Sequence, residues 1–127
     1  MLLYKIDIYF NLIILIVKSI YWQKINKLEK IFKILESPKG TQMRNSNFDS
    51  KYFNFALNRI CRILKVKKCL TKSMALFMIL KNYQKKPILL IGVSETNAFS
   101  SHSWVRCEGR NYGLTRSISY KKIKQIE

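Results

Sequence analysis

The residues of this sequence best suited to chemistry are Cys69 and His102, which stand 33 positions apart. Cys69 follows Lys67 and Lys68 and precedes apolar residues at three- and four-residue spacing, a pattern that predicts a helix with the cysteine in its first turn. The positive end of the helix dipole and the two lysines both favour the thiolate over the thiol. An accessible thiolate beside an imidazole is the activated nucleophile of a cysteine peptidase, in which the histidine serves as base and then as acid.

The alternative interpretation is that Cys69 is a small apolar residue of the core, because free cysteine is among the most buried residue types. We predict that Cys61 and Cys107 are buried thiols of this kind. Three cysteines without a CxxC pair favour free thiols in a reducing cytoplasm over a disulfide framework. Because His102 is the single histidine and no closely spaced ligand pair occurs, the sequence predicts neither a metal site nor a cofactor.

The elements that must position these two residues begin with helices. Apolar residues recur at helical spacing over residues 12–35 and 52–64, and we expect one or two long helices in the first of these stretches. Polar residues 36–50, which include a proline and a glycine, separate the two stretches as a loop. The helix that begins at Cys69 should end near Asn82, because a lysine-rich loop and a proline follow.

After that helix the pattern changes to one typical of short strands. Residues 88–93 form a continuous apolar run, as buried strands do. After a loop, residues 102–107 alternate, which places His102 and every second residue after it on one face of a second strand. We expect residues 108–111 to form a turn and residues 112–120 to return as the hairpin partner.

Helices followed by a small antiparallel sheet predict an α+β fold, in which the helix that bears Cys69 packs on the sheet. A length of 127 residues and an apolar fraction of 48% are sufficient for a single domain with one core. Within residues 1–127 we distinguish an N-terminal helical part, residues 1–59, from a core of residues 60–127 that contains both Cys69 and His102.

An apolar run near the N-terminus, residues 8–17, has to be weighed as a membrane segment. Asp7 and Lys18 bound it after ten residues, about half of the length needed to cross a bilayer. It also lacks the basic region and the small-residue cleavage site of a secretory signal. We expect it to belong to a helix that packs on the rest of the domain, and a helix lying on a membrane surface is the less favoured alternative.

The net charge of +17 is concentrated in residues 41–86, which contain eleven basic residues and one acidic residue. Lysines outnumber arginines by eighteen to six, whereas bidentate recognition of phosphates or base edges favours arginine. The sequence also shows no strand that combines basic and aromatic residues in the manner of single-strand-binding proteins. We therefore expect no nucleic acid as partner, and favour a basic surface that attracts an acidic peptide.

Three segments around Cys69 and His102 together resemble a known family. "CLTKSMALFMIL", "ILLIGV" and "FSSHSWVRCEG" are similar to the transglutaminase-like cysteine peptidases that mature lasso peptides, the lasso peptide B2 proteins. The matching positions are Cys69, Leu70, Ser73, Ala75, Leu76, Ile91, Gly92, Val93, Phe99, His102, Trp104, Val105, Glu108 and Gly109. The resemblance is specific over residues 60–110 and architectural over residues 1–59. It implies a transglutaminase-like or papain-like core.

The resemblance also implies a function. Such proteins remove the leader from a ribosomally made precursor peptide, and a separate macrolactam synthetase then joins the freed amine to an acidic side chain. A separate small protein recognises the leader, so this chain looks like the peptidase half. Cys69 would attack the scissile carbonyl and His102 would move the proton, with no metal or cofactor.

The third member of the expected catalytic triad is not evident. The family's aspartate lies about a dozen residues beyond the histidine, where this sequence reads Asn-Tyr-Gly-Leu over residues 111–114. Asn111 is the first candidate for orienting the imidazole, because papain-like enzymes use asparagine in that role. Glu108 is the alternative. An inactive scaffold of the same fold is therefore one rival to an enzyme, and a basic protein that binds a membrane surface or nucleic acid is another.

Overall fold

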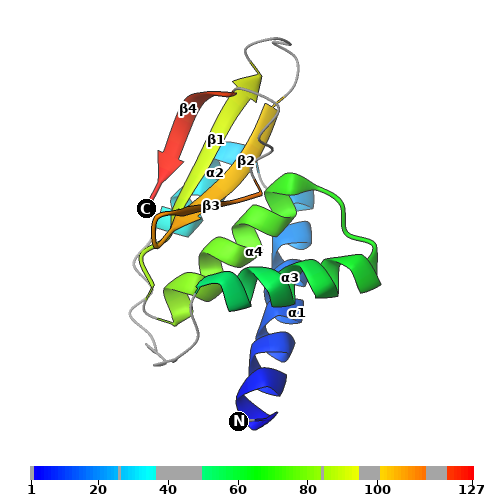
Figure 1. Ribbon diagram of the computed structural model, residues 1–127. Helices are drawn as coiled ribbons and strands as arrows, with labels where there is room; N and C mark the ends of the chain where they lie inside the picture. The colour runs from blue at the N-terminus through cyan, green and yellow to red at the C-terminus, as the bar shows by residue number, and fades with distance from the viewer. Residues whose placement is uncertain (1, 26, 37–49, 84, 95–100, 114–119) are drawn as a thin grey trace.

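The computed structural model describes residues 2–25, 27–36, 50–83, 85–94, 101–113 and 120–127 (Figure 1). Within these residues helices precede strands, which confirms the α+β fold expected from the sequence. The helices are α1 (Leu2–Ile25), α2 (Leu28–Glu36), α3 (Ser50–Leu64) and α4 (Cys69–Asn82). The strands are β1 (Ile88–Ser94), β2 (Ser101–Cys107), β3 (Arg110–Tyr112) and β4 (Tyr120–Ile126).

The helices form where the apolar spacing predicts them, with one difference at the N-terminus. α1 has 24 residues and extends beyond the apolar run of residues 8–17 on both sides. α4 begins at Cys69 and ends at Asn82, as expected. The loop predicted over residues 36–50 falls almost entirely on residues 37–49, which lie outside the described residues, as do residues 95–100 with the motif residue Phe99.

A tight connection between α3 and α4 sets the position of Cys69. Lys65 takes a left-handed backbone conformation, with φ of 58°, and the N–H of Val66 donates to the carbonyl of Cys61 at 2.9 Å. This is the pattern of hydrogen bonding that closes a helix C-terminus. The chain then passes through Lys68, which is extended, directly into α4.

The sheet has the strand order β3-β2-β1-β4, and each strand is antiparallel to its neighbours. Glu108 and Gly109 form the turn between β2 and β3, with φ of 53° and 75°. Positive φ at both central residues is typical of a two-residue hairpin turn. The expected four-residue turn at 108–111 is therefore too long, and β3 begins at Arg110. Of the expected return strand, residues 114–119 lie outside the described residues, and β4 was not predicted.

Helix α4 is the centre of the core. Figure 1 shows it between the sheet and two other helices, with α3 crossing in front and α1 behind. The sequence predicted one buried face, but every residue from Ser73 to Leu80 is buried because α4 has neighbours on all sides. On the sheet, Leu89, Val105 and Cys107 belong to the same core. The start of α4 is thus held between β2 and α3.

Helix α1 buries one face and exposes an apolar stripe on the other. Seven large apolar side chains of this stripe are between 38% and 62% exposed. They are Ile6, Phe10, Ile13, Ile14, Val17, Tyr21 and Ile25. The segment Ile6–Ile25 is long and apolar enough to cross a membrane by length and composition alone, a test that core helices and signal sequences also pass. The apolar run of residues 8–17 is therefore shorter than the apolar segment that the helix contains.

Candidate active site

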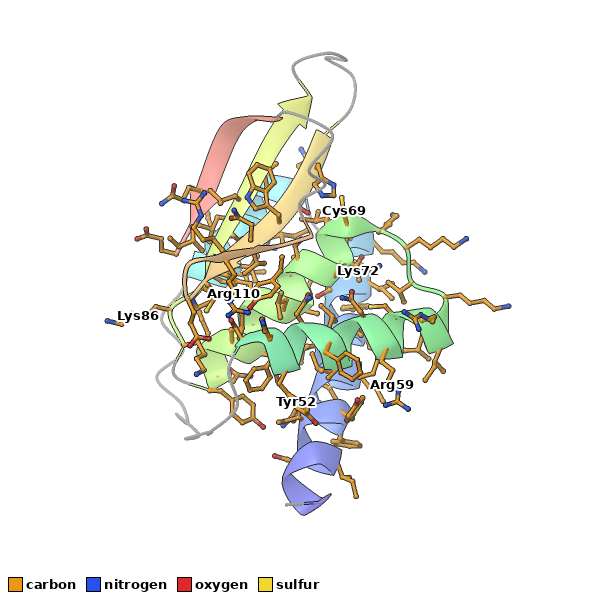
Figure 2. All side chains as sticks on the ribbon, in the orientation of Figure 1. Tyr52, Arg59, Cys69, Lys72, Lys86 and Arg110 are labelled. Atoms are coloured by element: carbon orange, nitrogen blue, oxygen red, sulfur yellow. The ribbon has the colours of Figure 1, made fainter. Side chains whose placement is uncertain are left out.

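Cys69 and His102 line the same cavity, which has a volume of about 210 Å³. The structure therefore brings together the two residues predicted as nucleophile and base. Both side chains are partly exposed, so the cavity is open to a substrate. The other walls come from α3, the first turns of α4 and the β2–β3 hairpin, and Figure 2 shows Cys69 at the start of α4 with Lys72 one turn further along.

The start of α4 leaves backbone N–H groups available beside Cys69. The first hydrogen bond of the helix runs from the N–H of Lys72 to the carbonyl of Lys68 at 3.2 Å, so the amides of residues 69–71 have no acceptor within the helix. Lys68 occupies the N-cap position, and its side chain makes no capping hydrogen bond. These amides are placed as donors for an oxyanion that develops on a carbonyl attacked by the thiolate.

His102 is oriented by a main-chain group. Its Nε2 is hydrogen-bonded to the carbonyl oxygen of Gly113, and its ring lies nearly parallel to that of Trp104, at 18° with 6.4 Å between centroids. A carbonyl oxygen only accepts, so Nε2 carries the proton in the neutral ring and Nδ1 carries the lone pair. This tautomer leaves Nδ1 as the base that a cysteine peptidase requires.

A buried hydrogen bond joins the two elements that carry the catalytic pair. The hydroxyl of Ser103 donates to the hydroxyl of Ser73 at 3.2 Å, and both side chains are buried in the wall of the cavity. Ser103 follows His102 directly on β2, and Ser73 lies one turn after Cys69 on α4. The bond therefore fixes β2 against α4 beside the cavity that Cys69 and His102 line.

The structure does not bring Asn111 to the imidazole. Asn111 is opposite Arg106 in the β2–β3 register, and its side-chain oxygen accepts a hydrogen bond from Nε of Arg106 at 3.1 Å. Arg106 is four residues along β2 from His102, a separation of about 13 Å. The structure therefore shows Asn111 bonded to Arg106 and not to the ring, and Nε2 of His102 is bonded to the carbonyl of Gly113.

Glu108, the alternative candidate, follows the last residue of β2, whereas His102 lies near the start of that strand. Its Oε1 accepts a hydrogen bond from the N–H of Ser50 at 2.7 Å, and its Oε2 lies 3.7 Å from Nζ of Lys85. The carboxylate therefore caps the start of α3. The hydroxyl of Ser50 is also 2.6 Å from that of Tyr112, a bond in which either oxygen is the donor. Glu108 thus holds α3 against the hairpin and does not orient His102.

Another contact missed by the sequence reasoning anchors the first turn of α4 to α1. Nε2 of Gln23 donates to the hydroxyl of Thr71 at 2.7 Å and to the carbonyl of Ser19 at 3.1 Å. Thr71 is buried two residues after Cys69. Local patterns in the sequence carry no signal for this pair, because Gln23 and Thr71 are 48 positions apart.

The three thiols have different environments. Cys61 and Cys107 are 1% and 2% exposed, as predicted, and burial raises the pKa of both thiols. Glu108 raises the pKa of Cys107 further. Cys69 is only partly buried and faces the cavity, so it is the accessible thiol. Within the described part of the chain no three His, Cys, Asp or Glu side chains are grouped as a metal site would require.

This arrangement, a cysteine at a helix start facing a histidine on an antiparallel strand, agrees with the result of a comparison with protein families. The model of the transglutaminase-like superfamily matches residues 13–124. The chain belongs to the transglutaminase-like superfamily. The match includes most of residues 1–59, the part expected to be similar only in architecture. The comparisons with curated proteins and with solved structures give no match. The superfamily assignment establishes a fold of the cysteine-peptidase type.

Proposed function

We propose that this transglutaminase-like protein is a cysteine peptidase that removes the leader from a ribosomally made, lasso-type precursor peptide. The observation that carries the proposal is the shared cavity of Cys69 and His102, in which the carbonyl of Gly113 fixes the imidazole. The finer assignment to leader removal is supported by the sequence resemblance over residues 60–110.

The reaction begins when Sγ of Cys69 attacks the scissile carbonyl carbon and Nδ1 of His102 takes the thiol proton. The resulting oxyanion accepts hydrogen bonds from the amides at the start of α4. Collapse of this intermediate breaks the C–N bond, and His102 gives its proton to the departing amine. The leader then remains on Cys69 as a thioester, and the core peptide leaves with a free N-terminal amine.

Water completes the cycle. Nδ1 of His102 takes a proton from water as the oxygen attacks the thioester carbon, and the leader leaves with a new carboxylate while Cys69 recovers its proton. The freed amine is the group that a separate macrolactam synthetase would join to an acidic side chain. A separate leader-recognition protein would deliver the precursor. Three free thiols, two of them buried, agree with a reducing cytoplasm as the place of action.

Mass spectrometry of a precursor incubated with this protein and the recognition partner tests the proposal. We expect cleavage at one bond, slow without the partner and faster with it, and none with Cys69→Ala. Cys69→Ser keeps the shape of the site but weakens the nucleophile, so it should leave at most a trace of activity. Cleavage by Cys69→Ala at the rate of the unmodified protein would show that the cavity is not the active site.

A non-catalytic scaffold of the same fold is the rival, and the absence of a carboxylate or amide from the position held by the Gly113 carbonyl favours it. A scaffold would bind precursor and partners with unchanged affinity in Cys69→Ala and would release no leader in any combination. Trapping of the thioester with hydroxylamine separates the two, because only an enzyme gives a leader hydroxamate.

Attachment to an anionic membrane surface is a second candidate function, favoured by the exposed apolar stripe on α1. Exposed apolar patches of this extent mark interaction sites, and the net charge of +17 complements an anionic bilayer. Flotation with phosphatidylcholine vesicles, with and without phosphatidylglycerol, tests it. We expect binding to the anionic vesicles alone and its loss in Phe10→Ser/Val17→Ser. Dimerisation through the stripe, without vesicle binding, would contradict it.

A further inference from the structure

The cavity that contains Cys69 and His102 continues into a second, larger hollow along the exposed side of α3. Asn54, Asn58 and Tyr112 line both, so the two form one continuous depression. The second hollow has a volume of about 730 Å³ and is bordered by Lys51, Phe55, Arg59 and Arg62 in addition to the shared residues. We call this second hollow the α3 groove.

The lining of the whole depression is basic. Lys67 and Lys72 border the cavity beside Cys69, and Arg59 and Arg62 border the α3 groove. Among the residues that the structure describes, no acidic residue lines either part and no carboxylate pairs with any of these four cations. Their charge is therefore available to a ligand, and the depression concentrates it over one connected surface.

The spacing of the polar residues suits an extended chain. Lys51, Asn54, Asn58 and Arg62 follow one another at three- and four-residue intervals and so share one face of α3. The two asparagine amides offer both donors and acceptors, as a peptide backbone needs. The cations at either end offer partners for carboxylates. Figure 2 shows Arg59 on α3 and Cys69 at the start of α4, both on the side of the molecule where α3 leads into α4.

We infer that the α3 groove binds an acidic segment of the peptide whose scissile bond lies at Cys69. A peptide is favoured over a nucleic acid because the groove runs directly into a Cys–His pair, which acts on acyl groups. This inference rests on the proposed peptidase activity for its choice of ligand. Binding itself needs no catalysis and is measured separately.

Fluorescence anisotropy with Cys69→Ala as the binding protein isolates the groove from the chemistry. The probes are a glutamate-rich peptide, its glutamine counterpart of equal length, and a single-stranded oligonucleotide of matching charge. We expect the glutamate peptide to bind about tenfold more tightly than the glutamine peptide, with the difference shrinking at high salt. Equal affinity for both peptides, or tighter binding of the oligonucleotide at the same residues, would overturn the inference.

Charge-removing variants locate the binding. Arg59→Gln/Arg62→Gln should weaken the binding of the glutamate peptide about three- to tenfold, as expected for the loss of two exposed ion pairs. The affinity for the glutamine peptide should not change. Lys24→Gln/Lys30→Gln removes the same charge from exposed positions on α1 and α2 and serves as the matched control. An equal loss in the control would show a general effect of net charge and would contradict a specific groove.

Cleavage assays with the intact Cys69 then distinguish the two proposals. If the α3 groove acts as inferred, Arg59→Gln/Arg62→Gln raises KM for an acidic substrate and leaves kcat unchanged. Cleavage without any preference for acidic substrates would contradict the proposed role of the α3 groove and support the peptidase activity. Tight binding of the acidic peptide without cleavage would support the role of the groove and contradict the peptidase activity.

Discussion

Nε2 of His102 is hydrogen-bonded to the main-chain carbonyl of Gly113, at the position where an orienting carboxylate or amide was expected. The carbonyl sets the required tautomer, because it only accepts and so leaves the lone pair on Nδ1. It does not supply the full negative charge with which an aspartate stabilises the imidazolium. We therefore expect the protein to cleave its precursor slowly.

The first prediction concerns the backbone that carries this carbonyl. Gly113 has φ of 88°, a conformation that costs an L-residue about 1–2 kcal/mol. An alanine at position 113 would be strained in this conformation. We expect the backbone of Gly113→Ala to relieve the strain by shifting the peptide plane, which moves the acceptor away from His102. We expect kcat to fall about tenfold or more, with KM nearly unchanged, in steady-state assays of precursor cleavage.

Gly109→Ala is the matched control for that variant. Gly109 has φ of 75° in the β2–β3 turn, and an added Cβ would meet no atom within 4 Å. Both variants should lower the melting temperature to a similar extent. Only Gly113→Ala should lower kcat, and a parallel loss in Gly109→Ala would assign the effect to strain in the hairpin.

Asn111 provides the second prediction. Its side chain accepts from Arg106 on the exposed surface of the hairpin, so Asn111→Ala should change kcat by less than about twofold. Nuclear magnetic resonance of the His102 ring checks the same point, since the chemical shift of Nε2 should move in Gly113→Ala and stay constant in Asn111→Ala. A tenfold loss of kcat in Asn111→Ala would restore the assignment made from the sequence.

The contrast between these residues shows what the sequence could reveal about the site. Residue type, helical spacing and strand alternation, which are local signals, made Cys69 and His102 candidates, and the family resemblance then favoured them over a core cysteine. The carbonyl of Gly113 was missed because a main-chain acceptor has no residue type of its own. The candidate Asn111 came from spacing along the chain, whereas the two-residue turn at Glu108 and Gly109 sets the register and places Asn111 opposite Arg106.

The sequence likewise predicted the parts of the fold that have a local pattern and missed the parts that depend on tertiary contacts. Apolar periodicity located α1, α3 and α4, but not the burial of α4 on all sides, which depends on how α1, α3 and the sheet pack around it. The contact between Ser50 and Glu108 joins residues 58 positions apart and has no local signature. β4 was missed because most of its residues are polar, and its pairing with β1 is a tertiary event.

Glu108 leads to a third prediction, on stability. Its carboxylate accepts the N–H at the start of α3, so Glu108→Ala should lower the free energy of unfolding by about 1 kcal/mol. Glu108→Gln retains an acceptor oxygen and should recover part of that loss. Chemical denaturation measures both. A tenfold change in kcat with unchanged stability would instead place Glu108 in the catalytic machinery.

A fourth prediction tests the bond between Ser73 and Ser103. Removal of one hydroxyl leaves the other buried without its partner, so Ser73→Ala and Ser103→Ala should each lower the free energy of unfolding by about 1–3 kcal/mol. Ser73→Ala/Ser103→Ala removes both and should cost less than the sum of the single changes. Strict additivity in a double-mutant cycle would show that the two hydroxyls do not interact.

The last prediction uses the three thiols as internal controls for one another. Iodoacetamide reacts with the thiolate and needs access to it. Cys69 faces the cavity, whereas Cys61 and Cys107 are buried and their pKa values are raised by that burial above the ordinary 9.0. At neutral pH we therefore expect Cys69 to be alkylated at least about tenfold faster than the other two. Because a raised pKa keeps a thiol protonated to higher pH, labelling of Cys61 and Cys107 should stay low up to pH 9.0 and increase only above it, or after unfolding in guanidinium.

Peptide mapping by mass spectrometry gives the three rates in one experiment. Equal rates at neutral pH in the folded protein would show that Cys69 is neither activated nor preferentially accessible, and would remove the nucleophile on which the proposed peptidase depends.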